Sequence, residues 1–171
     1  VCLIEAGPRD GFLIRNCNPL NMLALMKSRT YNWGYSAEPQ ARTGNRRFFW
    51  PRGRALGGSS SINAMIYTRG HPSDYDQWAA RGNPGWDYQS VLPYFRCSER
   101  QQRGADAWHG AEGTMDVVDT NFRFPASSAF VQACGEAGLP LNNDMNGAQQ
   151  EGCGFFQVTQ TPEGGRANSS R

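Results

Sequence analysis

The sequence lacks the long apolar run that a membrane-spanning helix needs. A span requires about 20 consecutive apolar residues, and no apolar run in the 171 residues approaches that length. Charge of one sign is also scarce, because 17 Lys and Arg stand against 15 Asp and Glu, for a net charge of +2. The basic residues are scattered apart from Arg46-Arg47 and Arg52-Gly53-Arg54. This balance argues against a nucleic acid or an anionic membrane as partner.

Signals for metal sites and disulfide frameworks are missing as well. The presence of only two histidines, His71 and His109, argues against a multi-histidine metal centre. The cysteines are odd in number, widely spaced and form no C-x-x-C pair, which speaks against a disulfide framework or a zinc site. They are Cys2, Cys17, Cys97, Cys134 and Cys153. We predict no metal site and ordinary thiols in a reducing compartment. The expected location is cytoplasmic, with peripheral association at the inner membrane as the open alternative.

What the sequence does contain is a glycine- and serine-rich block, Gly57-Gly58-Ser59-Ser60-Ser61, preceded by Arg52 and Arg54. The two glycines let backbone approach a ligand where a Cβ would clash. The serines offer hydroxyls, and one of them would cap a helix running through Ile62, Met65 and Ile66. A glycine turn that feeds a helix N-terminus binds anions, so the block predicts a phosphate-bearing ligand. The alternative is a Gly-Ser loop before a buried helix, since the block is neither a Walker A loop nor G-x-G-x-x-G.

A wider stretch, from Gly53 to Asp76, resembles the first signature of the glucose-methanol-choline (GMC) family of flavin oxidoreductases. The rest of the chain is similar to the alcohol and choline dehydrogenase branch of that family. The matching residues of the signature are Gly53-Arg54, Leu56-Gly57-Gly58-Ser59-Ser60, Ile62-Asn63, Tyr67, Gly70 and Asp76.

The resemblance implies an α/β fold that covers an N-terminal part of a family member. We expect residues 1–171 to form a partial FAD-binding Rossmann-like domain, without the family's first strand and G-x-G-x-x-G loop. The beginning of an α+β substrate-binding domain would be mixed into about 115–171. An ordinary nucleotide-binding module is disfavoured, because it would not require the block from Gly53 to Asp76.

The resemblance also implies FAD as the cofactor. Glu5, at the end of the expected strand Val1–Ile4, would bind the adenosine ribose, as an acidic residue does in dinucleotide-binding folds; a surface glutamate is the alternative. The block would lie along the ribityl and pyrophosphate side, with the next residues near the isoalloxazine ring. The expected cofactor-binding residues are Glu5, Arg54, Gly57, Gly58, Ser59, Asn63, Ala64 and Met65. Ile62 stands where some members carry the histidine that links FAD covalently, so we expect non-covalent FAD.

The implied chemistry is oxidation of an alcohol, with a hydride passing from the substrate carbon to the flavin N5 and a base taking the hydroxyl proton. The expected partners are a small-molecule alcohol and an electron acceptor, a quinone or other non-oxygen carrier. The family's catalytic base is a histidine near its C-terminus, which neither His71 nor His109 matches, so no catalytic residue is assigned. An FAD-bearing lyase of the same family and a non-catalytic truncated fragment remain as alternatives.

Local patterns predict the remaining elements. Trp33 is interpreted as a core aromatic and His109 as a structural loop residue. Helices are expected at Leu20–Met26, at Trp86–Glu99 with a start or kink at Pro93, and from Ala167 onward. Another is expected to begin at a capping box of Ser73 and Asp76 and to end at Gly82. A further helix is expected at Pro125–Gly138, with Ser127 or Ser128 as its cap. Extended segments are expected at Val1–Ile4, Tyr31–Pro39, Thr114–Val118 and Gly154–Thr161.

Overall fold

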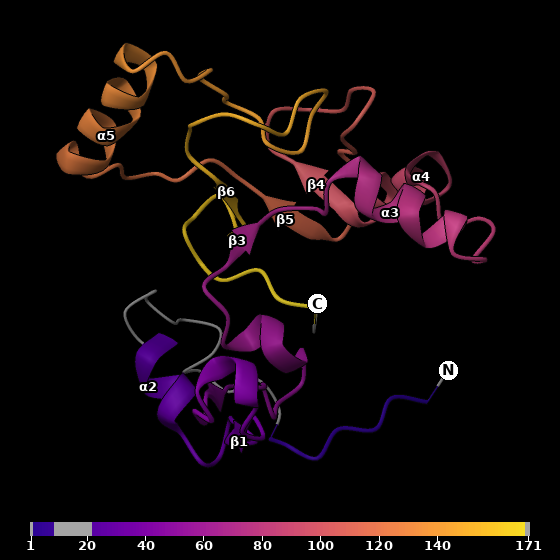
Figure 1. Ribbon diagram of the computed structural model, residues 1–171, viewed down its shortest axis with the longest axis vertical. Helices are drawn as coiled ribbons and strands as arrows, with labels where there is room; N and C mark the ends of the chain where they lie inside the picture. Colours follow the sequence, from indigo (N-terminus) through magenta and orange to yellow (C-terminus); the bar gives the residue numbers. More distant parts are fainter. Residues whose placement is uncertain (1, 9–21, 170–171) are drawn as a thin grey trace. The chain divides into compact units, whose positions relative to one another are not determined.

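The computed structural model describes residues 2–8 and 22–169 of the chain (Figure 1). The chain divides into two compact units. Residues up to Met65, together with those from Gly165, form unit 1, and Ile66–Gly164 form unit 2. The assignment of about 115–171 to the beginning of a substrate-binding domain stays a prediction. Among the described residues, no helix is both long and apolar enough to cross a membrane.

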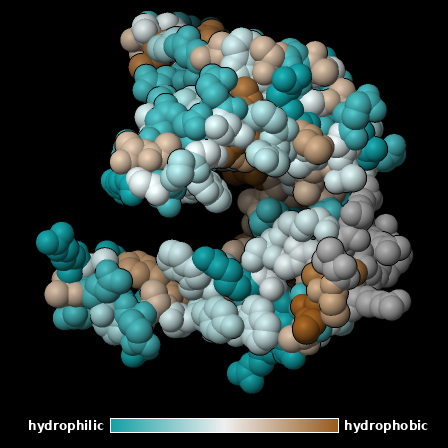
Figure 2. Space-filling view, turned by 90° about the vertical axis from the view of Figure 1, so that its right-hand side faces the viewer, coloured by the Kyte–Doolittle hydropathy of each residue, from teal (hydrophilic) through white to brown (hydrophobic). Residues whose placement is uncertain are grey.

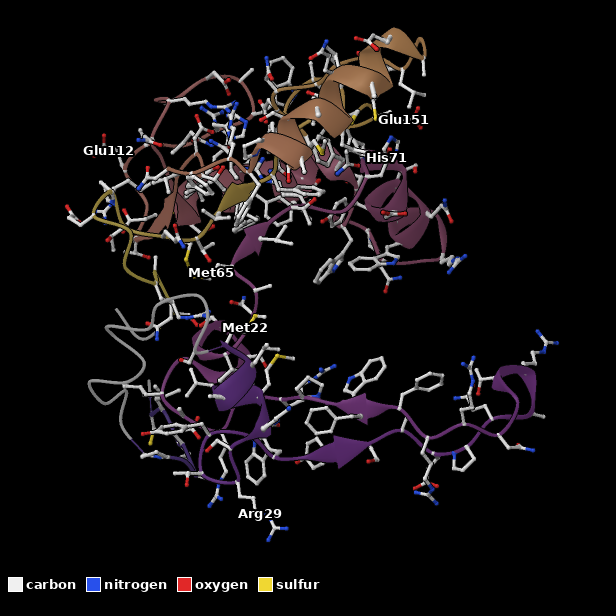
Figure 3. All side chains as sticks on the ribbon, turned by 90° about the vertical axis from the view of Figure 1, so that its left-hand side faces the viewer. Met22, Arg29, Met65, His71, Glu112 and Glu151 are labelled. Atoms are coloured by element: carbon white, nitrogen blue, oxygen red, sulfur yellow. The ribbon has the colours of Figure 1, made fainter. Side chains whose placement is uncertain are left out.

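Unit 1 contains a short helix and a hairpin. Helix α2 spans Met22–Lys27, as expected within one or two residues. Strand β1 (Tyr35–Ser36) pairs antiparallel with β2 (Phe49–Trp50), and the 3-10 turn η2 (Ala41–Thr43) lies between them. Figure 3 shows aromatic side chains along this pair of strands. Of the extended segment expected at Tyr31–Pro39, only Tyr35–Ser36 forms a strand.

Trp33, beside this hairpin, is not a core residue. It is 45% exposed, and its ring stacks on Tyr35 with 6.0 Å between centroids. The small described core of unit 1 consists instead of Leu25, Ala55 and Ile62. An aromatic residue on a two-stranded hairpin has one face without a covering layer, so hydrophobicity alone did not decide its burial.

The strand expected at Val1–Ile4 does not form in its described part, Cys2–Ile4. Leu3 and Ile4 are 77% and 89% exposed, and no described strand pairs with them. An apolar run becomes a strand only where a neighbour pairs with its backbone groups and a layer covers its side chains. The described residues supply neither.

Unit 2 contains three helices and two small sheets. Helix α3 (Pro72–Ala80) packs against α4 (Tyr88–Ser98), and the Tyr75 ring lies 6.0 Å from Tyr88 and 5.7 Å from Phe95 between centroids. Figure 1 shows these two helices side by side. Tyr88 and Phe95 thus serve packing, as the sequence indicates.

The strands of unit 2 are short. Strand β3 (Ile66–Tyr67) pairs antiparallel with β6 (Gln157–Val158). Strand β4 (Glu99–Gln101) pairs in parallel with β5 (Met115–Val117). Helix α5 (Pro125–Glu136) lies between β5 and β6 in the chain. The expected strands at 114–118 and 154–161 and the expected helix at 125–138 are present, but each is shorter than predicted.

Helix α3 begins two residues before its predicted start. His71 is the N-cap: its Nδ1 accepts a hydrogen bond from the Ser73 N–H at 3.2 Å, and Asp74 Oδ2 accepts one from the His71 N–H at 2.9 Å. The predicted box of Ser73 and Asp76 is therefore wrong. Proline suits the first helical position because it has no N–H to satisfy, and Pro72 fixes the register there.

The starts of α4 and α5 also differ from expectation. Helix α4 begins behind Asp87, whose Oδ1 accepts from the Ser90 N–H at 3.0 Å, and it runs through Pro93. A start at Pro93 is therefore wrong. Helix α5 has Pro125 at its first position and no side-chain cap, so the expected serine caps are wrong too. In all three helices the start lies at a local cap or proline other than the one predicted, and helix boundaries are the least determined feature of a sequence pattern.

A buried ion pair holds unit 2 together around β4. Glu99 is fully buried, and its Oε2 accepts a hydrogen bond from Arg69 Nη2 at 2.6 Å. Arg69 Nη1 donates to the Trp108 carbonyl oxygen at 2.7 Å, and the Arg69 N–H donates to Asn146 Oδ1 at 2.8 Å. A single arginine thus joins the segment after β3 to β4 and to two loops.

We expect Glu99→Ala to lower the free energy of unfolding by about 3–5 kcal/mol, because it leaves the Arg69 guanidinium buried without its counter-charge. Chemical denaturation would measure the loss. The matched control is Glu112→Ala, which removes an exposed glutamate and should change stability by less than about 0.5 kcal/mol. Equal stability of the two variants would contradict the assigned role of the ion pair.

His109 lies between two carboxylates in the same cluster. Its Nδ1 is 3.0 Å from Glu99 Oε1, and its Nε2 is 3.0 Å from Asp144 Oδ2. Only a doubly protonated imidazole can donate to both. The hydrogen bond to Glu99, with further support from Asp144, raises the pKa of His109 above its ordinary value against the opposing effect of burial. The structure thus gives His109 a structural role, in agreement with the sequence interpretation.

This arrangement makes stability depend on pH. Because the folded pKa is raised, the contribution of His109 is complete below the unfolded pKa of about 6.5 and is lost as pH rises through the folded value. We expect the melting temperature to fall as the pH rises from the unfolded to the folded pKa of His109. In His109→Gln the part of this fall that is due to His109 should be absent. The control His71→Asn keeps a capping acceptor and should show the same pH-dependent fall in melting temperature as the wild type. An unchanged pH profile in His109→Gln would refute the prediction.

Candidate cofactor-binding loop

The glycine- and serine-rich block folds as a tight turn instead of the predicted helix. Residues Gly58–Ser61 form the 3-10 helix η3, and the Ile62 and Asn63 N–H groups both donate to the Ser59 carbonyl oxygen, at 3.1 and 2.9 Å. Asn63 Oδ1 then accepts from the Met65 N–H at 3.0 Å, and Met65 has a left-handed φ of 64°. The Asn63–Met65 turn prevents η3 from continuing as a longer helix, and β3 begins directly after Met65 (Figure 3).

Glycines allow two backbone crossings beneath this turn. A Cβ at Gly53 would lie 2.0 Å from the Gly58 carbonyl oxygen, and one at Gly7 would lie 2.0 Å from the Arg54 carbonyl oxygen. No side chain fits at either position. Gly58 differs, because its φ is 54° and a Cβ there would meet no atom of the described residues within 4 Å. The backbone of Gly58 is therefore open to a ligand.

The serine hydroxyls serve the loop itself. Ser59 Oγ accepts from the Gly53 N–H at 3.1 Å, Ser60 Oγ donates to the Gly57 carbonyl oxygen at 2.5 Å, and Ser61 Oγ donates to the Leu56 carbonyl oxygen at 2.9 Å. The expectation that the serines also offer hydroxyls to a ligand stays a prediction, because Ser59 Oγ accepts here and keeps its own proton to donate. Their hydrogen bonds fix the turn, and its backbone remains as the surface that a ligand would meet.

Arg54 brings a positive charge to the same place. Its guanidinium lies over the Trp33 ring, 5.3 Å from the centroid, and Nη2 donates to the Ala6 carbonyl oxygen at 3.4 Å. Its Nε is buried and has no hydrogen-bond partner in the described structure. A buried donor without a partner is costly, so this atom suits an acceptor supplied by a ligand.

A hollow of about 460 Å³ lies beside Arg54 within unit 1. Its lining carries cationic, aromatic and amide side chains together, which suits a ligand that is both anionic and planar. The lining residues are Met26, Lys27, Ser28, Arg29, Asn32, Trp33, Gly34, Phe49 and Arg54.

The structure brings the segment of Glu5 against the block, although the two lie far apart in the sequence. The Leu56 N–H donates to the Pro8 carbonyl oxygen at 3.3 Å, beside the crossing at Gly7. The exposed Glu5 carboxylate accepts from the Gly7 N–H at 2.7 Å. Asn63 and Ala64 are exposed, whereas Met65 is buried. The cofactor roles of these residues stay predictions.

Sequence reasoning missed a group of residues from Arg166 to Ser169 that contact the loop. Asn168 Nδ2 donates to Ser61 Oγ at 3.0 Å, and the Ser169 N–H donates to Ser60 Oγ at 3.0 Å. The helix expected from Ala167 is not formed in its described part, Ala167–Ser169, and residues 170–171 lie outside the described range. No spacing pattern could have indicated contacts across more than 100 residues.

One cluster in unit 2 has the residue types of a metal site. Ligand atoms of Asp106, His109 and Asp144 lie within 4.8 Å of one another. Both ring nitrogens of His109 already face carboxylates, and Asp106 Oδ1 accepts from the Trp108 and His109 N–H groups at 2.7 Å each. These hydrogen bonds account for the cluster without a metal ion.

A family model described as GMC oxidoreductase matches residues 16–171. The chain belongs to the GMC oxidoreductase family. The alcohol dehydrogenase (acceptor) of Pseudomonas putida is 45% identical over 172 residues, which cover 100% of this chain and 31% of that protein. The mitochondrial choline dehydrogenase of Mus musculus is 42% identical over 167 residues, which cover 93% of this chain and 28% of that protein. The resemblance seen in the sequence is thereby confirmed.

Solved structures agree on the fold of this GMC chain. Pyridoxine 4-oxidase from Mesorbium loti matches with a TM-score of 0.86 and 34% identity over 97% of this chain and 32% of its own. An FAD-dependent oxidoreductase from Chaetomium thermophilum matches with a TM-score of 0.78 and 31% identity over 96% of this chain and 30% of its own. The predicted partial α/β Rossmann-like fold is confirmed. The GMC chain spans about a third of the length of these relatives.

Proposed function

We propose that this GMC chain is the flavin-binding part of an FAD-dependent alcohol dehydrogenase. The observation that carries the proposal is the η3 turn, where the Gly58 backbone is open while the three serine hydroxyls make hydrogen bonds to backbone groups of the loop. Backbone at a glycine turn approaches a dinucleotide closely. The names of the relatives, alcohol and choline dehydrogenases, supply the substrate class, a small alcohol.

The residues present fit FAD. Gly57, Gly58 and Ser59 would hold the ribityl and pyrophosphate side, with Asn63, Ala64 and Met65 beside the ring. The unpartnered Nε of Arg54 adds a donor for an anionic or carbonyl acceptor, and Glu5 is assigned to the ribose. When bound, FAD supplies the hydride acceptor for oxidation of a CH–OH group.

Neither histidine of the chain is assigned as the base. His71 caps α3, and both ring nitrogens of His109 face carboxylates. Ile62 is 2% exposed and packs in the core of unit 1, so the position next to Asn63 offers no nucleophile for a covalent flavin link. We therefore propose non-covalent FAD.

Experiments distinguish between the possible electron acceptors and between the dehydrogenase, the lyase and the non-catalytic fragment. The relatives' names include both an acceptor-linked dehydrogenase and oxygen-dependent choline dehydrogenases; we propose a quinone or other non-oxygen carrier. A lyase of the same family would leave the flavin oxidised during turnover. A non-catalytic fragment would bind no flavin, and the 171-residue chain should be compared with the full-length protein.

The first test is the absorbance spectrum of the purified full-length protein. We expect a flavin spectrum whose chromophore stays in the supernatant after acid precipitation, because no covalent link forms. Anaerobic addition of choline or a simple primary alcohol should bleach it, and a quinone should restore the oxidised spectrum faster than oxygen does. A protein that contains no flavin would refute the proposal, and flavin that precipitates with the protein would refute the non-covalent link.

A substitution at Gly58 tests the loop directly. We expect Gly58→Val to abolish FAD binding in the full-length protein, because its side chain would occupy the open face of the turn. The matched control is Gly138→Val at the end of α5, where φ is also positive, at 84°, and a Cβ also meets nothing within 4 Å in the part of the chain that the structure describes. It carries similar backbone strain, of about 1–2 kcal/mol, and should keep FAD. Normal FAD affinity in Gly58→Val would contradict the assignment.

A further inference from the structure

Arg166 is the most deeply buried charged group in contact with the η3 turn. It is 2% exposed, and its guanidinium donates hydrogen bonds to the chain 103 to 106 residues earlier. Nη1 donates to the Ser60 carbonyl oxygen at 3.0 Å and to Asn63 Oδ1 at 2.7 Å, and Nη2 donates to the Asn63 carbonyl oxygen at 2.9 Å. The planar fork of an arginine fits such a set of acceptors, which a lysine cannot match.

These contacts fall on the atoms that determine the conformation of the segment after η3. The Ser60 carbonyl lies in the last turn of η3, where carbonyl groups lack helical partners. Asn63 Oδ1 accepts from both Arg166 and the Met65 N–H. It therefore links the guanidinium to the left-handed Met65 turn, a conformation that costs a non-glycine residue about 1–3 kcal/mol and persists only where its surroundings fix it.

We propose that Arg166 is a positioning residue for the cofactor: it holds Asn63 and the Ser60–Met65 segment in the conformation that faces the flavin ring. This inference rests on the proposed function. Arg166 need not touch FAD, because it acts through Asn63. Neighbouring hydrogen bonds from Asn168 to Ser61 and from Ser169 to Ser60 support the same turn. The segment from Arg166 to Ser169 therefore stabilises the loop through several of its residues.

The test compares Arg166→Met and Arg166→Lys with the wild type in the full-length protein. FAD is removed, folding of each apoprotein is checked by near-UV circular dichroism and melting, and FAD is titrated back by its fluorescence quenching. We expect Arg166→Met to bind FAD about tenfold or more weakly, the scale of one lost charged hydrogen bond, and to shift the flavin midpoint potential. Arg166→Lys should be intermediate, because one ammonium group replaces part of the fork.

The control for general destabilisation is Arg69→Lys. Arg69 is also a buried arginine, but it lies in unit 2, and its hydrogen bonds, among them those to Glu99, Trp108 and Asn146, do not involve the loop. This substitution should lower the melting temperature and leave FAD affinity and potential unchanged. Wild-type FAD affinity in folded Arg166→Met would overturn the inference. So would equal losses of affinity in Arg166→Met and Arg69→Lys, since they would mark both as purely structural. A wild-type protein without FAD would refute the proposed function itself, and the inference with it.

Discussion

The loop of unit 1 depends on backbone lying directly against backbone. Gly53 crosses Gly58 and Ser59 at a distance that leaves no room for a Cβ, and Gly7 crosses Arg54 in the same way. These two crossings bring the Glu5 segment, Arg54 and the η3 turn into one place. Because a hydrogen atom is the only side chain that fits, the arrangement is a steric requirement, and hydrophobic burial contributes little to it. The described core of the unit is correspondingly small.

Polar groups take over much of the work that an apolar core does elsewhere. In unit 2, Arg69, Glu99 and His109 are buried and satisfy one another. In unit 1, the buried Arg166 donates hydrogen bonds to the carbonyl oxygens of Ser60 in η3 and of Asn63 after it. Many large apolar residues remain exposed, and the face shown in Figure 2 is mostly hydrophilic to intermediate, with apolar residues in small groups. Buried polar networks specify geometry sharply, because each unmade hydrogen bond inside the protein is costly.

The serine run shows how little a local motif reveals about its hydrogen-bond partners. Its glycines and serines predict a cofactor loop, which stays a proposal for this member of the GMC oxidoreductase family. The hydroxyls bind the loop's own backbone and lie in a 3-10 turn, and the helix expected after them does not form, because β3 begins at Ile66. A hydroxyl that can reach both a ligand and a nearby carbonyl does not reveal its partner in the sequence. The unit 1 fold decides it by bringing Leu56, Gly57 and Gly53 within reach.

The sequence by itself determined the family, the mixed α/β class, the position of the glycine loop and the approximate places of α2, α5 and the β5 strand, because those depend on local residue pattern. Only the tertiary structure decided which residues support the loop and whether an apolar run is paired. Arg166 lies more than 100 residues from its acceptors, and the apolar run at Leu3–Ile4 forms no strand. The start of α3 is a different case, because His71 and Ser73 are both local capping candidates and the structure shows that His71 is the cap. The physical reason for the first two is that a buried charge or a strand is specified by the partner that reaches it, and partners distant in sequence leave no periodic trace.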